Sequence, residues 1–126
     1  MTSFDTQHLR NVALLSHSGT GKTSIVEALL FATGAITRLG RVEDGTTTSD
    51  HEPEEIKRGS SIQTSVVPCN WRDYKLNLLD TPGYPDFVGE PTSALRAVEA
   101  AVLVVAAQAG VEVGTENAWD LCDDLD

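Results

Sequence analysis

Residues 16–23 carry two glycines, a lysine and several hydroxyl side chains, and they follow directly on the apolar run 12–15. The glycines allow successive backbone N–H groups to point at one anion, and the positive end of a following helix would add to this attraction. Lys22 can reach the outer phosphates of a nucleotide, and the Thr23 hydroxyl can ligate Mg²⁺. The spacing therefore predicts a loop that binds a nucleoside triphosphate with Mg²⁺. The alternative is a helix start that reads Gly-Lys-Thr by chance, and Ser16 stands where the usual pattern has glycine.

Residues 80–83, Asp-Thr-Pro-Gly, follow a second apolar segment, 76–79. If that segment is a strand, the Asp80 carboxylate emerges at its carboxyl end, where ligands bind in open parallel sheets. A simple turn would account for the composition of residues 80–83. It would not account for a carboxylate at a strand end in a chain that also carries a phosphate loop. The two segments together predict a polyphosphate and Mg²⁺ site.

The elements that position these residues follow from the apolar pattern. The run 12–15 predicts a buried parallel strand, and the segment after the loop predicts a helix that stops at Gly34. The apolar face expected for this helix consists of Ile25, Val26, Leu29 and Leu30. Residues 35–58 show no apolar period, and so long a segment without regular structure is expected to move or to bind something. Within it, Pro53 followed by acidic and then basic residues predicts a short helix.

The second half of the chain predicts more of the same layered architecture. Strands are expected at 62–68 and 75–79 with a turn at 70–73, and a helix is expected to start at Pro91 and to bury Leu95 and Val98. A fully buried strand is expected at 101–105, and a last helix from about Thr115 with Trp119 and Cys122 on one stripe. The sum is an α/β fold with a mostly parallel sheet and helices on both faces.

Composition limits the classes of partner and compartment. The 126 residues suit one small domain, and the net charge of −10 argues against a DNA-binding surface. The N-terminal residues 1–5 lack the basic and then apolar pattern of a signal peptide, and the longest apolar run is far shorter than the roughly 20 residues that span a bilayer. We therefore expect a cytoplasmic protein with no membrane partner. Cys69 and Cys122 fit no metal-ligand spacing and are expected to be buried free thiols.

Several short segments resemble the G domain of the translational GTPases. Among these proteins the resemblance is strongest to elongation factor G, and in particular to its divergent second form, elongation factor G-2. The segments that carry the resemblance stand in matching order at 10–12, 40–42, 44–50, 58–62, 80–84 and 86–90. The resemblance covers nearly the whole chain. It implies a P-loop NTPase G domain that binds GTP or GDP with Mg²⁺, and the ribosome as the partner. It also implies a first switch over residues 35–61 and a second switch over residues 80–90.

The resemblance assigns roles to individual positions. The metal would be held by Thr23, Ser61 and Asp80, with Asp80 acting through water and Ser61 standing where the family has threonine. The Gly83 N–H would sense the γ-phosphate. The nucleotide-binding residues would be Ser16, His17, Ser18, Gly19, Thr20, Gly21, Lys22, Thr23, Ser24, Asp80, Thr81, Pro82 and Gly83.

Two departures from the family pattern bear on hydrolysis. Tyr84 occupies the position of the histidine that orients the attacking water, and Gly19 that of an acidic residue. A phenol with an ordinary pKa of about 10 is a poor base at neutral pH. Since activating elements can be worth about 10⁵ in rate, we expect slow hydrolysis by this chain alone. Two alternatives stay open: a GTP-dependent ribosome-binding module with negligible hydrolysis, and an ATP-dependent phosphotransferase.

The guanine-reading Asn-Lys-x-Asp motif of the family does not occur in the chain. Guanine preference is thus implied by the resemblance and not by any residue present. We expect residues 1–126 to be the N-terminal part of a G domain that stops before its last strands. The strand at 101–105 would then have a bare apolar edge beside the first strand, so the isolated chain is expected to self-associate.

Overall fold

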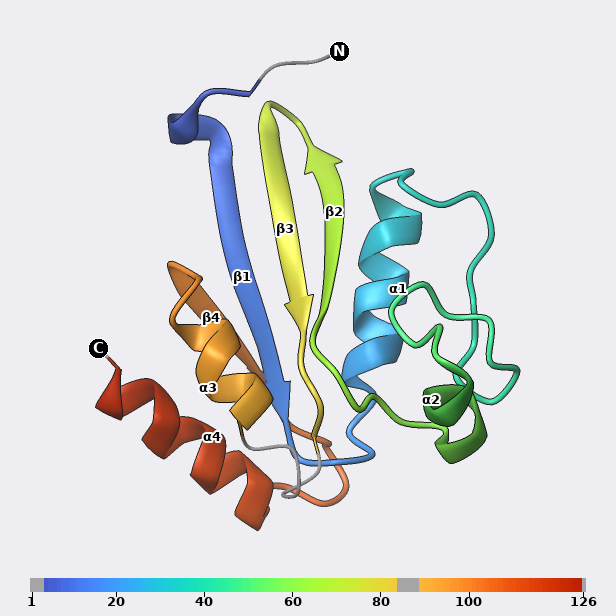
Figure 1. Cartoon of the computed structure of the whole chain (residues 1–126), viewed down its shortest axis with the longest axis vertical. Coiled ribbons are helices and arrows are strands. Elements are labelled where there is room, and N and C mark those ends of the chain that lie inside the picture. The colour runs from blue at the N-terminus through green and yellow to red at the C-terminus, as the bar shows by residue number, and fades with distance from the viewer. Residues whose placement is uncertain (1–3, 84–88, 126) are drawn as a thin grey trace.

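The computed structural model describes residues 4–83 and 89–125 of the chain (Figure 1). After a short 3₁₀ turn at Thr6–His8, the described elements follow one another as a strand, two helices, two strands, a helix, a strand and a helix. Their bounds are β1 Leu9–Ser16, α1 Lys22–Ala32, α2 Pro53–Arg58, β2 Ser65–Trp71, β3 Tyr74–Asp80, α3 Gly89–Leu95, β4 Ala100–Val104 and α4 Val113–Asp124.

The four strands form one mixed sheet in the order β2-β3-β1-β4. β1 pairs in parallel with both β3 and β4, whereas β2 pairs antiparallel with β3 through a tight hairpin. The register places Leu14 of β1 beside Asp80 of β3, and Ser16 beside Val104 of β4. The α/β fold with a mostly parallel sheet is confirmed.

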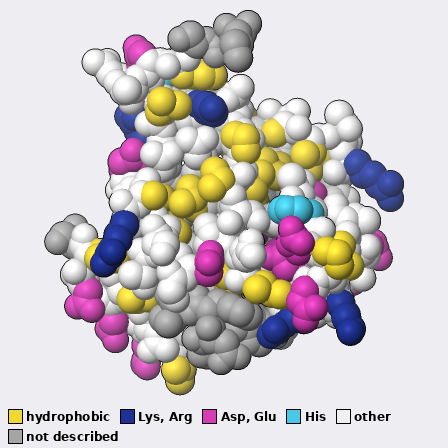
Figure 2. Space-filling model, in the orientation of Figure 1, with side chains coloured by type: hydrophobic (Ala, Val, Ile, Leu, Met, Phe, Trp, Pro, Cys, Tyr) yellow, Lys and Arg dark blue, Asp and Glu magenta, His cyan; other side chains and the backbone are white. Residues whose placement is uncertain are grey.

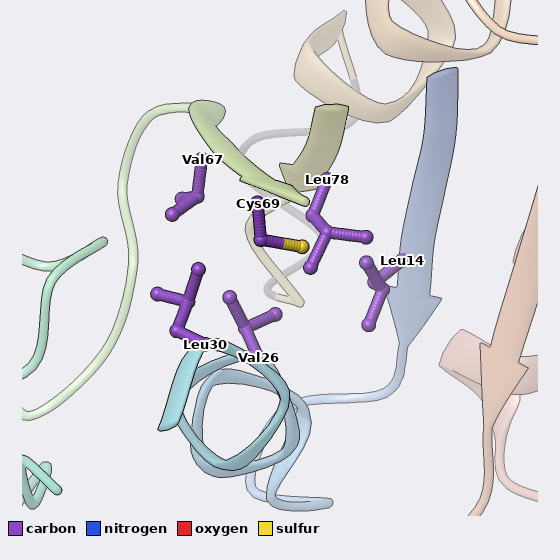
Figure 3. Close-up of a cluster of buried hydrophobic side chains, with 6 residues drawn as sticks. All are labelled: Leu14, Val26, Leu30, Val67, Cys69 and Leu78. Carbon is purple, nitrogen blue, oxygen red and sulfur yellow. The ribbon is translucent and has the colours of Figure 1, made fainter. Parts of the chain in front are cut away.

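Helices cover both faces of the sheet, with α1 on one side and α3 and α4 on the other (Figure 1). Successive strand residues point to opposite faces, so Leu14 packs toward α1 while Ala13 packs toward α3. Figure 3 shows the first of these two cores, in which α1 directs two side chains at the sheet. This core contains Leu14, Val26, Leu30, Val67, Cys69 and Leu78. The second core contains Ala13, Leu79 and Ala94, with the half-buried Leu95 and Val98 packed against it. α3 begins at Gly89, two residues before the expected start at Pro91, and ends at Leu95, so Val98 lies beyond the helix rather than on its buried face.

The first helix and the short helix form where the sequence predicts them. α1 buries a narrower stripe than expected, because Val26 and Leu30 face the sheet while Ile25 and Leu29 stay about 40% exposed. α2 begins at Pro53, with acidic residues in its first turn and basic residues in its last, as predicted.

The prediction that a strand starts at residue 62 is wrong, since β2 starts at Ser65. The backbone N–H groups of residues 62–64 donate to side chains instead of to a neighbouring strand. Glu55 accepts from residues 62 and 63 at 2.9 and 3.2 Å, and Glu90 accepts from residue 64 at 2.8 Å. These carboxylates replace the first part of the expected ladder, so the strand begins three residues later than predicted and also ends three residues later, at Trp71.

The structure also corrects the predicted burial at the far edge of the sheet. β4 is an edge strand rather than a fully buried one, and its Val102 side chain is 48% exposed. α4 begins at Val113, two residues before the expected start, and Trp119 on it is 60% exposed. Both cysteines are free thiols, but only Cys69 is buried, while Cys122 is half-buried.

Candidate functional site

The loop between β1 and α1 runs across the carboxyl ends of the parallel strands. Gly19 and Gly21 take positive φ angles of 77° and 89°, a backbone conformation that residues with a side chain rarely adopt. The loop ends where α1 begins, at Lys22. Residues 16–24 line one hollow, together with residues of the segment 42–61 and with Gly83. The structure thus gathers the whole predicted loop around a single concavity.

Lys22, which lines this hollow, forms an ion pair with Asp80, and both side chains are buried. Asp80 also accepts a hydrogen bond from the Thr23 hydroxyl at 2.9 Å. Burying two charges is costly unless they are paired and hydrogen-bonded, which is the arrangement here. The contact forms because β3 ends beside the start of the loop, so the structure places Asp80 at a strand end as the sequence predicts.

Ser61 completes this polar cluster from the long segment between α1 and β2. Its Oγ lies 3.3 Å from Thr23 Oγ1 and donates to Asp50 Oδ1 at 2.5 Å. The three residues predicted to hold a metal, Thr23, Ser61 and Asp80, are therefore brought together. They come from α1, the long segment and β3, and Ser61 and Asp80 are separated from Thr23 by 38 and 57 residues.

Asp50 is a member of the cluster that the sequence analysis missed. It is 4% exposed and lines the hollow. Burial raises the pKa of its carboxyl group, as do the nearby charges of Asp80 and Glu55, while the Ser61 hydrogen bond opposes this rise. No local pattern marks Asp50 as a site residue, because its partner Ser61 lies 11 positions away in a segment without periodicity.

The second predicted segment lies directly against the loop. The Thr81 hydroxyl donates to the Leu14 carbonyl at 2.7 Å, and both Thr81 and Pro82 are buried. At Gly83, a Cβ atom would come within 3.0 Å of the Ser18 backbone. This close approach places the Gly83 backbone beside the loop, and a side chain here would have to displace the Ser18 backbone by a few tenths of an ångström. Tyr84, the position expected to act on the attacking water, lies outside the described residues.

His17 connects the loop to the start of α4, a contact that the sequence did not indicate. Its Nδ1 accepts from the Gly114 backbone N–H at 3.2 Å, and its Nε2 lies 3.7 Å from a Glu112 carboxylate oxygen. A Cβ atom at Gly114 would lie only 2.5 Å from His17 Nδ1. The loop is therefore supported by α4 as well as by α1.

The donor atoms of the cluster fit a magnesium ion bound together with a phosphate. Mg²⁺ takes oxygen ligands, and it is usually held by one or two protein groups with waters and phosphate oxygens completing the shell. The hydroxyls of Thr23 and Ser61 and the carboxylate of Asp80 are such ligands. Asp50 Oδ2 is a buried oxygen without a hydrogen-bond partner beside them. Among residues 4–83 and 89–125 no three His, Cys, Asp or Glu side chains form a metal site by themselves.

A glycine-rich loop between a parallel strand and a helix, with a carboxylate at the adjacent strand end, defines a P-loop nucleotide-binding domain. The family model described as "Elongation factor Tu GTP binding domain" matches residues 7–126. The chain belongs to this family of GTP-binding domains.

Individual relatives agree with the family. Elongation factor G of Thermotoga petrophila is 41% identical over 119 residues, which cover 94% of this chain and 17% of the relative. Elongation factor G 2 of Streptomyces coelicolor is 42% identical over 115 residues, covering 91% of this chain and 17% of the relative. A crystal structure of a protein from Thermus thermophilus matches with a TM-score of 0.89 at 51% identity, over 91% of this chain and 17% of that one. The chain thus spans about a sixth of the length of these relatives.

Within the described parts of the chain, no helix is both long and apolar enough to cross a membrane.

Proposed function

We propose that the chain is the N-terminal part of the G domain of a translation factor of the elongation factor G type. In this proposal the domain binds GTP with Mg²⁺, and the whole factor hydrolyses GTP on the ribosome. The observation that carries the proposal is the cluster of Lys22, Thr23, Ser61 and Asp80 at the mouth of the glycine-rich loop. The family match and the elongation factor relatives support guanine as the base and the ribosome as the partner.

Each part of the site then has a stated role. The backbone of residues 16–24 holds the phosphates, and Lys22 supplies a positive charge to the outer ones. Thr23, Ser61 and Asp80 hold Mg²⁺, which neutralises phosphate charge when it is bound. Residues 35–61 act as the first switch, and residues 80–90 as the second, with the Gly83 N–H facing the γ-phosphate. Ser61 joins the metal site from the first switch, so this switch is sensitive to the third phosphate.

A second function, GTP-dependent ribosome binding with negligible hydrolysis, is favoured by Tyr84. A neutral phenol can shield the site or donate a hydrogen bond, but it does not readily accept a proton from water. Gly19 removes a further side chain that could orient water or a cation. The third alternative, an ATP-dependent phosphotransferase, is set aside because the matching family is a GTP-binding domain.

The two remaining functions are separated by the hydrolysis rate of the whole factor. Single-turnover cleavage of GTP is measured with and without ribosomes, for the natural factor and for Tyr84→His. We expect slow cleavage by the natural factor without ribosomes, and at least a tenfold gain in ribosome-stimulated turnover for Tyr84→His, because a positioned base contributes about 10² to 10⁴ in rate. If Tyr84→His gives no gain, Tyr84 is not what limits the rate of hydrolysis. Absence of GTP binding at millimolar concentration would overturn the proposed function itself.

The proposed partners follow from charge as well as from the relatives. On the face shown in Figure 2, Lys and Arg side chains are spread over the surface and interspersed with Asp and Glu. Together with the net charge of −10, this supports a factor that does not bind DNA through this domain. We place the factor in the cytoplasm with the ribosomes on which it acts.

A further inference from the structure

Glu27 is a buried carboxylate that the proposed site does not use. It lies on α1, one turn beyond Thr23, and it is 2% exposed. A buried carboxylate is costly unless several donors satisfy it. Glu27 accepts from the backbone N–H groups of Gly40 at 3.1 Å and Thr48 at 2.9 Å, and from the Thr48 hydroxyl at 3.3 Å. All three donors belong to the long segment between α1 and α2.

Gly40 shows how closely this segment approaches the carboxylate. A Cβ atom built at Gly40 would lie 2.6 Å from Glu27 Oε1 and 2.3 Å from the Thr46 carbonyl oxygen. Real Cβ atoms do not tolerate such distances, so a side chain at Gly40 would force the segment to rearrange where Gly40 meets Glu27 and Thr46. The contact is therefore specific to a glycine opposite a buried glutamate.

The same segment supplies the polar cluster of the site. Residues 40–48 lead directly to Asp50, whose carboxylate accepts from Ser61, and Ser61 in turn contacts Thr23. Thr23 and Glu27 lie on the same helix, so α1 holds the segment at two points. One point is at the phosphate site and the other is one turn further along α1.

We propose that Glu27 is a positioning residue that holds residues 40–48 where Asp50 and Ser61 can reach the metal site, and that it thereby favours the triphosphate over the diphosphate. The inference rests on the proposed function. The loop at 16–24 serves the phosphates that GTP and GDP share, whereas Ser61 reaches the site only from the segment that Glu27 holds. Loss of the Glu27 contacts therefore weakens GTP binding selectively.

The test is Glu27→Gln in the full-length factor that carries this chain. Glutamine keeps the size of the side chain, but its NH₂ group faces a backbone N–H, so one of the two backbone hydrogen bonds is lost. We expect the Kd for Mg-GTP to rise about tenfold and the Kd for Mg-GDP to stay within about twofold. A role limited to stability would raise both constants alike. An unchanged ratio of the two constants would overturn the proposal.

Trypsin provides a second measurement that reports on the segment itself. Arg38 and Arg41 flank Gly40, and both side chains are exposed. With GTP bound, we expect cleavage after these arginines to be at least fivefold faster in Glu27→Gln than in the natural factor. Equal cleavage rates would contradict the proposed contact. The matched control is Glu116→Gln, which makes the same chemical change at an exposed position of α4 and should alter neither measurement.

Gly40→Ala covers the case in which Glu27→Gln does not fold, because it breaks the same contact from the segment without changing α1. It should reproduce the selective rise in the Kd for GTP, and an unchanged GTP-to-GDP ratio in a folded Gly40→Ala protein would count against the inference. The two levels of the proposal are distinguishable. If the natural factor binds no GTP, both the proposed function and this inference are wrong. If the natural factor binds GTP and the variants keep its ratio of the Kd for GTP to the Kd for GDP, only the inference about Glu27 is wrong.

Discussion

At the scale of single residues, the ion pair between Lys22 and Asp80 is part of the site, and burying its two charges costs desolvation free energy. Both groups are buried, with exposed fractions of 6% and 0%. Their charges are tolerated because each satisfies the other and because the Thr23 hydroxyl donates to the carboxylate. Removing either charged group would therefore leave the other one buried without its partner, which destabilises the fold.

We expect Lys22→Met to lower the free energy of unfolding by about 3 kcal/mol, because it leaves a buried carboxylate without its cation. Asp80→Asn should cost less, since a lysine stem can carry its charge toward solvent. The double variant should recover part of the Lys22→Met loss. Urea unfolding of the four proteins of this cycle, without nucleotide, measures the coupling. Additive losses in the double variant would show that the two groups do not stabilise each other.

At the scale of elements, the loop is held by two helices. α1 begins at the loop itself, and α4 reaches it through the contact between His17 and Gly114. α4 starts with a capping box in which Glu112 and Thr115 exchange hydrogen bonds, so the position of Gly114 is fixed by the helix start. A change at the first turn of α4 is therefore expected to alter nucleotide affinity.

Gly114→Ala tests this connection. The added methyl group would collide with His17 at 2.5 Å from Nδ1 and 2.9 Å from Cα, and it would displace the loop or the helix start. Overpacking of this kind costs about 1–3 kcal/mol, so we expect GTP and GDP affinity to fall together by about tenfold. Titration with both nucleotides measures the effect. Val113→Ala, at a 66% exposed neighbour, is the matched control. A Gly114→Ala protein with natural affinity would show that α4 does not support the loop.

The elements show which parts of the structure the sequence can predict. Apolar periodicity predicts β1, α1 and the core contacts of Leu14 and Leu30, because these depend on neighbours in the chain. It could not predict that β2 starts late, or that the buried carboxylates of Glu27 and Asp50 accept hydrogen bonds from the long segment between α1 and β2. Those features depend on carboxylates that accept hydrogen bonds from residues 7 to 26 positions away, inside segments with no repeating pattern.

At the scale of the whole molecule, the sheet ends in an unprotected edge. Among the described strands β4 pairs only with β1, and Val102 on it is half exposed. Beside it lies a hollow between β4 and α4 that is lined by Leu95, Leu103, Trp119 and Cys122, among others. An apolar edge strand with free backbone groups is a site for pairing with another chain. The sequence of β4 contains neither proline nor a charged residue to prevent this, whereas β2 at the opposite edge contains Pro68.

We therefore expect the isolated chain of residues 1–126 to self-associate as its concentration rises, and Val102→Lys to reduce this association at least tenfold. A lysine on the edge strand places a charge where a second strand would pair, which costs desolvation in the associated state. Sedimentation velocity over a hundredfold concentration range measures both proteins. Val111→Lys adds the same charge at a position 67% exposed and outside the sheet, and it should leave association unchanged. If Val111→Lys is as effective as Val102→Lys, net charge rather than the β4 edge controls association. If the natural chain is a monomer throughout, the edge of β4 is protected by something other than a partner strand.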